Sequence, residues 1–212
     1  MVRKNRISVV IDTETSGLPS KRWADPIANP EAYESCRLVQ IAWIVVREGE
    51  TILEKSYFVK PEGFVISEGA MRINGITTER AQSEGLSFDL VLNEFVNDIK
   101  SVKVTHLVAH NLEFDKNVLL SEFARRAGHS DNIYTVKELK EVCTMECGRD
   151  FAKIPLPSNP KKYKAPKLTE LYAKLFGNPM REKHDALYDT RKCADCYNKM
   201  REMVRNKNVV DN

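Results

Sequence analysis

Two carboxylates stand two residues apart at the end of an apolar run near the start of the chain. The run covers residues 7–12, and the carboxylates belong to Asp12 and Glu14. In a β-strand, residues i and i+2 project from the same face, so these side chains are expected side by side. Burying such a pair is costly unless a cation neutralises it. Oxygen ligands of this kind suit Mg²⁺ or Mn²⁺, although two ordinary surface acids at a strand end share this spacing.

A third acid, Asp115, follows a second apolar run at residues 105–109. We expect it in the first turn of a helix, where the helix dipole favours negative charge whether or not a metal is bound. Its neighbour Phe114 is expected in the core, and its ring would also be able to flank a base.

A fourth acid and a histidine lie near the C-terminus. Asp189 shares a predicted helical stripe with small and apolar residues, namely Ala186, Cys193, Cys196 and Met200. An acid on such a face needs a partner. Asp185 is the expected N-cap, which places His184 in the loop just before the helix. Histidine ordinarily titrates near neutral pH, so His184 is a candidate proton acceptor; a solvated loop histidine is the alternative.

The elements that must position these residues form an alternating pattern. Apolar, β-branched runs predict five strands, at residues 7–12, 38–47, 51–59, 105–109 and 138–143. Apolar residues at helical spacing predict four helices, at residues 88–99, 114–127, 168–176 and 186–200. Ser87 is the expected N-cap of the first helix, and Gly128 and Gly177 are expected to end the next two. Gly49 predicts a hairpin between the second and third strands. This order predicts an α/β fold with a mixed sheet and one core.

The bulk properties set broad limits. The 212 residues suit one domain spanning residues 1–212, with an end that frays after about residue 205. The net charge of +3 permits a polyanionic partner, whereas a dedicated non-catalytic nucleic-acid binder is usually more basic. We find no signal peptide and no apolar stretch of membrane-spanning length. A cytoplasmic protein with no membrane partner and reduced cysteines is therefore expected.

Taken together with their neighbours, the acidic segments resemble the DEDDh family of 3′–5′ exonucleases, the DnaQ-like group. The resemblance rests on five segments: DTETSGL at 12–18, VQIA at 39–42, INGIT at 73–77, HNLEFD at 110–115 and HDALYD at 184–189. It extends over about residues 7–200. It implies an RNase H-like fold, in which helices flank a five-stranded mixed sheet.

The resemblance also implies roles for individual residues. Four carboxylates, those of Asp12, Glu14, Asp115 and Asp189, would hold two Mg²⁺ or Mn²⁺ ions. His184 would activate the attacking water, and a nucleoside 5′-monophosphate would leave. The terminal nucleotide would be bound by a further group of residues, Thr15, Gly17, Leu18, Asn111 and Phe114. The implied substrate is a nucleic acid with a free 3′ end, expected to be single-stranded.

Two connections are longer or more unusual than compact family members require. Residues 19–37 show little periodicity, and residues 152–166 are rich in proline and lysine and are expected to form a loop. Four lysines in or directly after this segment, Lys161, Lys162, Lys164 and Lys167, would be able to guide a strand, but a solvated loop has the same composition. Trp23 and Tyr33 would either stack on bases or pack the first connection.

The cysteines allow a metal-binding alternative. Cys143, Cys147, Cys193 and Cys196 have spacings compatible with zinc. Small residues that face a core produce the same spacings, and free cysteine is among the most buried residue types. We therefore favour packing.

Several functional alternatives stay open at this point. The chain is expected to be an exonuclease, and a catalytically silent nucleic-acid-binding protein of the same fold is the main rival. An RNA-processing or cyclic-nucleotide enzyme of this fold is a third hypothesis. No motif reports contacts to a 2′-hydroxyl, so DNA and RNA are not distinguished. A polymerase partner is possible but not indicated, and the oligomeric state is left open.

Overall fold

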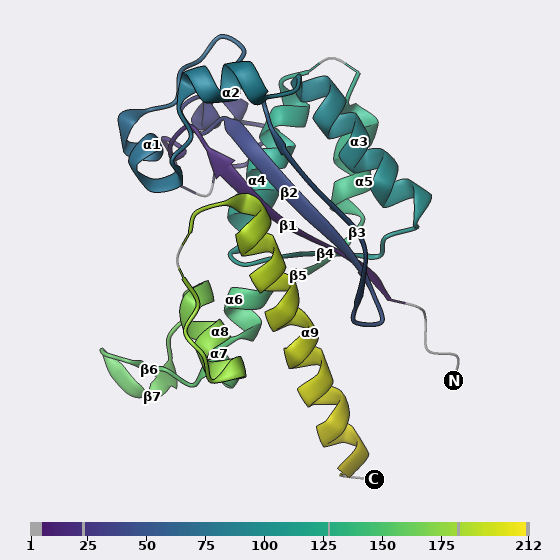
Figure 1. The fold of residues 1–212 in the computed structure, drawn as a ribbon, viewed down its shortest axis with the longest axis vertical. Coiled ribbons are helices and arrows are strands. Elements are labelled where there is room, and N and C mark those ends of the chain that lie inside the picture. The colour runs from purple at the N-terminus through teal and green to yellow at the C-terminus, as the bar shows by residue number, and fades with distance from the viewer. Residues whose placement is uncertain (1–5, 23, 127, 182, 211–212) are drawn as a thin grey trace.

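A five-stranded sheet forms the centre of the computed structural model, which describes residues 6–22, 24–126, 128–181 and 183–210 (Figure 1). Its strands are β1 (Ile7–Thr15), β2 (Leu38–Arg47), β3 (Glu50–Phe58), β4 (His106–Ala109) and β5 (Lys140–Cys143), in the order β3-β2-β1-β4-β5. β2 pairs antiparallel with both β1 and β3, whereas β4 pairs parallel with both β1 and β5. The predicted α/β fold with a five-stranded mixed sheet is confirmed.

The turn between β2 and β3 follows from its two central residues. Glu48 and Gly49 both have positive φ, at 54° and 97°, and Arg47 pairs with Glu50 across the turn. Two left-handed residues give a turn whose twist matches that of the flanking strands. The hairpin predicted from Gly49 is confirmed.

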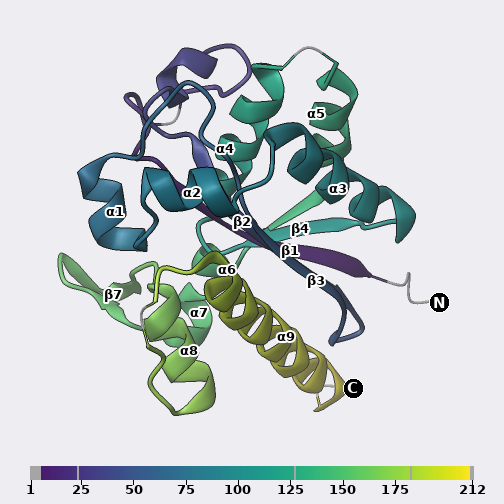
Figure 2. The ribbon, with the colours of Figure 1, turned by 45° about the horizontal axis from the view of Figure 1, so that its top comes forward.

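Helices cover both faces of the sheet, and the alternation of the strands explains how. Val9 and Ile11 of β1 join a core with α3 (Phe88–Ser101) and α4 (Leu112–Ala124). Val10 faces the other way and packs with residues of α9 (Ala186–Val210). Because successive side chains of a strand point to opposite faces, both faces of β1 are buried, and Figure 2 shows the helices on either side.

Two residues predicted to cap helices, Ser87 and Gly177, are confirmed in that role. The Ser87 side chain accepts a hydrogen bond from the Leu90 backbone nitrogen at 3.4 Å. Gly177, with a φ of 74°, ends α8 (Leu168–Phe176) in the left-handed conformation that glycine favours. The prediction for α4 was wrong at both ends, since that helix starts at Leu112 and ends at Ala124. Its expected last residue, Ala127, lies outside the described residues.

Several short elements were not predicted. They are η1 (Pro30–Tyr33), α1 (Glu68–Asn74), α2 (Thr78–Glu84), α5 (Ser130–Lys137), α6 (Thr144–Cys147), α7 (Arg149–Ala152), β6 (Pro155–Leu156) and β7 (Asn159–Tyr163). The region 152–166, predicted as a loop, contains the β6–β7 hairpin. The region 19–37 contains η1. α9 continues to Val210, beyond the expected helix end at residue 200 and the fraying expected after about residue 205.

The sequence left open whether Trp23, Tyr33 and the cysteines pack the interior or bind a ligand, and the burial of Tyr33 and two cysteines bears on this question. Tyr33 is 2% exposed, and its hydroxyl donates to the Ala24 carbonyl at 3.0 Å, so it packs the first connection. Trp23 lies outside the described residues. Cys193 and Cys196 belong to buried apolar clusters. Cys143 is half-buried and Cys147 is exposed, and within the described ranges the group with geometry for a metal ion is Glu14, His184 and Asp189.

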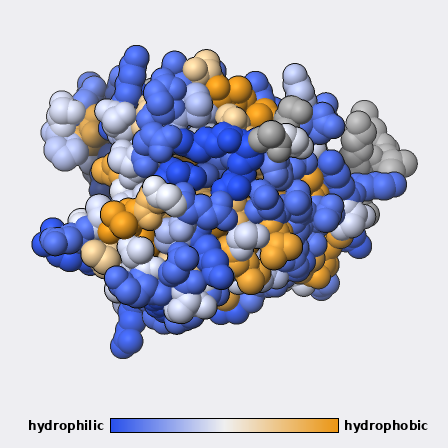
Figure 3. Space-filling view, turned by 90° about the horizontal axis from the view of Figure 1, so that it is seen from above, coloured by the Kyte–Doolittle hydropathy of each residue, from blue (hydrophilic) through white to orange (hydrophobic). Residues whose placement is uncertain are grey.

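The surface is predominantly polar on the face seen from above in Figure 3, where apolar residues gather only in separate patches. In the part of the chain that the structure describes, no helix combines the length and apolar character needed to cross a bilayer.

Candidate active site

β1 delivers the first two carboxylates to one end of the sheet. Asp12 pairs with Ala42 and Glu14 with Gln40 across the β1–β2 ladder, so the two acids project from the same face of the strand. The register shifts immediately after Glu14. Such an irregularity bends the strand and ends regular pairing, which leaves both carboxylates at its carboxyl end.

Parallel pairing between β1 and β4 brings Asp115 to the same end. Asn111 has φ 74° and ψ 47°, and this left-handed residue turns the chain from β4 into α4. Asp115, in the first turn of α4, is 3% exposed. Its Oδ1 accepts hydrogen bonds from the Thr13 backbone nitrogen at 3.0 Å and the Thr13 hydroxyl at 2.8 Å. Asp115 is thereby fixed directly to the residue between Asp12 and Glu14.

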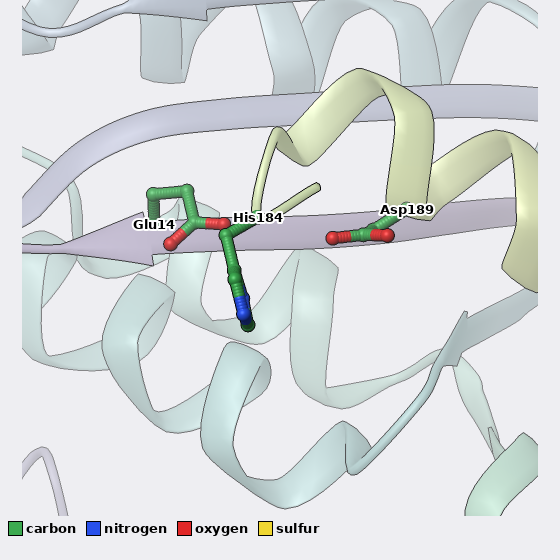
Figure 4. A group of neighbouring side chains, drawn as sticks. All are labelled: Glu14, His184 and Asp189. Atoms are coloured by element: carbon green, nitrogen blue, oxygen red, sulfur yellow. The ribbon is translucent and has the colours of Figure 1, made fainter. Parts of the chain in front are cut away.

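The start of α9 supplies the remaining candidates. The Asp185 carboxylate accepts from the Tyr188 backbone nitrogen at 2.9 Å, as expected for an N-cap. His184 precedes it with a φ of 48°. One ligand atom from each of Glu14, His184 and Asp189 lies within 4.8 Å of the others. Figure 4 shows these side chains gathered over β1, with His184 and Asp189 coming from either side of the first turn of α9.

The electrostatics show that the acids share one environment. Burial raises the pKa of Asp12 well above its ordinary value, and repulsion from Asp115, Glu14 and Asp189 raises it further. Burial, followed by repulsion from Asp189 and Asp115, raises the pKa of Glu14 to about 8. Burial also raises the pKa of Asp115 to about 7, against the hydrogen bonds from Thr13 that lower it. The shifts of Asp12 and Glu14 report negative charge that the surrounding protein does not compensate, whereas the shift of Asp115 reports the cost of burying its charged form.

The donor set fits a divalent cation. Within the described residues, no lysine or arginine forms an ion pair with Asp12, Glu14 or Asp115. Carboxylate oxygens are the ligands that Mg²⁺ and Mn²⁺ prefer. A bound cation would offset the repulsion among these acids and so stabilise their charged forms. The residues present therefore fit a divalent metal ion.

The sequence matches the family described as Exonuclease, RNase_T, over residues 9–197. The chain belongs to this exonuclease family. The resemblance inferred from the acidic segments is therefore confirmed at the level of the family. No curated protein sequence matches the chain.

Solved exonuclease structures share the fold at low sequence identity. Escherichia coli exonuclease I, in its zinc-bound complex with single-stranded DNA, is 18% identical with a TM-score of 0.63 and is matched over 94% of this chain and 41% of its own. A product-bound exonuclease I is 17% identical with a TM-score of 0.65, over 94% and 44%. Exonuclease I from Methylocaldum szegediense is 19% identical with a TM-score of 0.61, over 93% and 40%. The present chain thus spans about two fifths of the length of these proteins.

A pocket of about 280 Å³ lies beside the start of α4 in this exonuclease fold. It is lined by Leu18, Pro19, Arg22, Tyr33, Asn111, Glu113, Phe114 and Asn117. Three of the five residues predicted to bind the terminal nucleotide, Leu18, Asn111 and Phe114, are among them. Leu18 is 74% exposed, which is unusual for a leucine and leaves its side chain free to contact a ligand.

The other two predicted binding residues, Thr15 and Gly17, shape the turn before the pocket. The Thr15 hydroxyl donates to the Gly17 carbonyl at 2.7 Å. A side chain at Gly17 would bring its Cβ to 2.5 Å from the Ser35 carbonyl oxygen. Only glycine therefore fits at this position, and neither residue lines the pocket.

Three residues that support the site were not predicted individually. Thr13 holds Asp115, and the Gln40 side chain accepts from the Ala186 backbone nitrogen at 3.3 Å where α9 begins. The Asn74 amide donates to the Thr15 carbonyl at 3.2 Å, and it also hydrogen-bonds Glu14. All three lie within the family-like segments, so their position in those segments was the available signal.

Proposed function

We propose that this chain is a metal-dependent 3′–5′ exonuclease. It hydrolyses phosphodiester bonds from the 3′ end of single-stranded DNA or RNA and releases nucleoside 5′-monophosphates. The observation that carries the proposal is the convergence of mutually repelling acids from β1, α4 and α9 beside one histidine. Membership of the exonuclease family supports it.

Four carboxylates, those of Asp12, Glu14, Asp115 and Asp189, are proposed to hold two Mg²⁺ or Mn²⁺ ions. When bound, such ions lower the pKa of a coordinated water and stabilise charge on the attacking and leaving oxygens of a phosphodiester. Thr13 contributes by fixing Asp115 through two hydrogen bonds. The chain supplies this rigid arrangement before substrate binds, so less reorganisation is needed during the reaction.

His184 is proposed to accept the proton of the attacking water at an imidazole nitrogen. The backbone orients this residue: His184 has a positive φ of 48°, and the next residue, Asp185, caps the N-terminus of α9. General-base catalysis of this kind contributes about 10²–10⁴-fold to the rate. His184 lies close enough to Glu14 and Asp189 for their ligand atoms to be within 4.8 Å, so its imidazole faces the proposed reaction centre.

The pocket is proposed to bind the 3′-terminal nucleoside. Leu18 and Phe114 supply apolar contact surface from two segments far apart in the sequence, and Asn111 adds an amide. Thr15 and Gly17 hold the backbone turn that presents Leu18. Apolar and stacking contacts are available to every base, so this pocket would accept successive nucleotides of any sequence.

Single-stranded DNA is the first substrate to test. Exonuclease I has been solved with single-stranded DNA and with a dT13 oligonucleotide, and its fold is shared by this chain. We propose the same substrate class here, with RNA as the alternative. The activity is proposed for the chain acting alone, without a polymerase partner.

The deciding experiment is a substrate panel with Mg²⁺ or Mn²⁺. The panel comprises dT20, U20, a duplex with a mismatched 3′ end and dinucleotides, and the products are resolved by chromatography. We expect nucleoside 5′-monophosphates from the single strands, and no product in EDTA or from Asp115→Asn. Equal release by the wild type and Asp115→Asn would refute the proposed site. Metal-dependent binding without hydrolysis would instead establish a catalytically silent binding protein.

A further inference from the structure

The segment 153–167, here called the lysine hairpin, carries charged side chains of positive sign only. It contains five lysines and no acidic residue, in a chain with 33 basic and 30 acidic residues. β7 lies within it and is exposed along its whole length. Such a concentration of positive charge is unusual in a chain whose charges otherwise nearly balance, and it favours an anionic partner.

The lysines of this hairpin differ in whether a carboxylate of the protein pairs with them. Lys164 donates to both carboxylate oxygens of Glu170, at 2.6 and 2.8 Å, so its charge is compensated within the protein. Lys161 and Lys162 are exposed, and the described residues include no carboxylate that pairs with either of them. Tyr163 follows them with 38% of its surface exposed. Two exposed lysines thus directly precede an exposed tyrosine along β7, with Lys161 and Tyr163 on the same face of the strand.

The hairpin is anchored at the end of the sheet that carries the acids. His110 Nε2 lies 3.1 Å from the Pro166 carbonyl oxygen, and Nδ1 lies 3.0 Å from the Thr144 hydroxyl. Burial lowers the pKa of His110 to about 4, so the ring is neutral at physiological pH and has one N–H. A carbonyl only accepts, so Nε2 donates to Pro166 and Nδ1 is the acceptor.

This anchor relates the hairpin to the nucleotide pocket. His110 directly follows β4 and precedes Asn111, which lines the pocket. Both ribbon views show the hairpin beside α7 and α8, on the side of the molecule where α1 lies (Figures 1 and 2). The base of the hairpin contacts His110, the residue before Asn111, so a strand that extends beyond the nucleotide in the pocket would be able to reach the hairpin.

We propose that the lysine hairpin binds the sugar-phosphate backbone of the single strand upstream of the terminal nucleotides. Lys161 and Lys162 would contact phosphates, and Tyr163 would offer a stacking surface. Contacts of this kind are independent of base sequence, release counterions and weaken with salt. The inference rests on the proposed function for its substrate, but it concerns a surface separate from the four acids.

The test compares two double charge reversals. K161E/K162E changes the hairpin, and K100E/K103E applies the same charge change at two exposed lysines at the end of α3, on the opposite side of the ribbon in Figure 1. Binding of fluorescein-labelled dT20 is measured in an Asp115→Asn background, where hydrolysis is blocked. We expect binding about tenfold weaker for K161E/K162E and within about twofold for the control. The plot of the logarithm of the association constant against the logarithm of the salt concentration has a negative slope, and its magnitude should decrease by about 1.4 for two lost phosphate contacts.

Further arms separate this inference from the proposed function. In the otherwise wild-type chain, K161E/K162E should raise KM for dT20 and leave cleavage of the dinucleotide dT2 unchanged. Equal losses for dA20 and dT20 would support a backbone contact, and a loss confined to one of them would overturn it. The inference also fails if K161E/K162E binds like K100E/K103E, or if dT2 cleavage falls as much as dT20 cleavage. If the wild type binds dT20 but releases no mononucleotide, the exonuclease proposal fails while the binding comparison still decides the role of the hairpin.

Discussion

In the part of the chain that the structure describes, one region holds a buried acid whose charge is paired, and another holds acids whose charges are not. Glu122 of α4 is 0% exposed. Its carboxylate accepts from Arg37 Nε at 2.8 Å and Nη2 at 3.1 Å, and from the Leu38 backbone nitrogen at 3.1 Å. Arg37 also lies over the ring of Phe64 at 4.7 Å. Every part of this charge is balanced by the chain itself.

At the end of β1, the chain leaves the charge unbalanced. Burial raises the pKa values of Asp12, Glu14 and Asp115, and repulsion from neighbouring acids raises those of Asp12 and Glu14 further. A buried ion pair such as Arg37–Glu122 is complete without a ligand, whereas repelling acids acquire a favourable charge balance only when a cation binds. The comparison distinguishes acids that maintain the fold from acids that are available for chemistry.

The largest effect is expected from neutralising an acid of the proposed metal site. Asp12→Asn should lower kcat by on the order of 10³-fold or more, as removal of one member of a cooperating catalytic group does. Its midpoint of thermal unfolding in EDTA at pH 8 should be unchanged or higher, because one repelling charge is gone. Release of mononucleotides from dT20 and a thermal melt provide the two measurements. If Asp12→Asn kept more than a tenth of the wild-type kcat, the unpaired acids would not be the catalytic group, and the distinction from Glu122 would fail.

The opposite pattern is expected at the balanced pair. Arg37→Met leaves the Glu122 carboxylate buried without its partner, so the free energy of unfolding should fall by about 3–5 kcal/mol. The kcat of the folded protein should stay within about threefold of the wild type. Urea unfolding gives the stability, and the double variant Arg37→Met/Glu122→Gln is the control, since a neutral acceptor remains for the Leu38 nitrogen. The double variant should recover most of the loss; a loss as large as that of the single variant would show that the charge was not the cause.

The pH dependence of stability should reveal the unbalanced acids directly. The pKa of Glu14 rises from 4.5 to about 8 and that of Asp115 from 3.8 to about 7 on folding. Acids with raised pKa values favour the folded state while protonated, so their contribution is full below about pH 4 and is lost as pH rises through 7 and 8. In EDTA, we expect the free energy of unfolding to fall by on the order of 2 kcal/mol between pH 5 and 8.5, or about 4–8 °C in melting temperature.

Metal addition sharpens that experiment. Mg²⁺ or Mn²⁺ should raise the melting temperature at pH 8.5 and have little effect at pH 5, since protons and cations compete for the same carboxylates. Glu14→Gln should flatten both responses. If the wild type in EDTA were as stable at pH 8.5 as at pH 5, the acids would not be repelling one another as the structure indicates.

The sequence indicated which elements carry the candidate site residues more clearly than it indicated the short elements around them. A strong strand pattern leads into Asp12 and Glu14, although β1 continues past both of them to Thr15. Asp185 is a typical N-cap, and its hydrogen bond to the Tyr188 nitrogen confirms that role. The contact between Thr13 and Asp115 spans 102 positions, and no local pattern encodes such a distance. The short helices α6 and α7 and the β6–β7 hairpin escaped prediction because elements of two to five residues carry too few periodic positions.

The smallest effect is expected at Asn74, whose amide makes one hydrogen bond that supports the fold and one to an acid of the site. It donates to the Thr15 carbonyl at 3.2 Å and hydrogen-bonds the Glu14 carboxylate, which lowers a pKa that burial otherwise raises. A residue that orients a metal ligand typically changes metal affinity by 10–100-fold when it is removed. Asn74→Ala should therefore raise the Mg²⁺ concentration for half-maximal activity about tenfold and leave kcat at saturating Mg²⁺ within about threefold.

The control for Asn74 is Asn198→Ala, which removes an amide that donates to the Gly49 carbonyl at 3.1 Å. Asn198 lies on α9 away from the acids, so its loss should leave the Mg²⁺ dependence unchanged. Titrations of dT20 hydrolysis with Mg²⁺ compare the two variants with the wild type. If Asn74→Ala lowered kcat without moving the Mg²⁺ midpoint, Asn74 would support the fold around α1 rather than the Glu14 carboxylate, and the unbalanced site would consist of the acids alone.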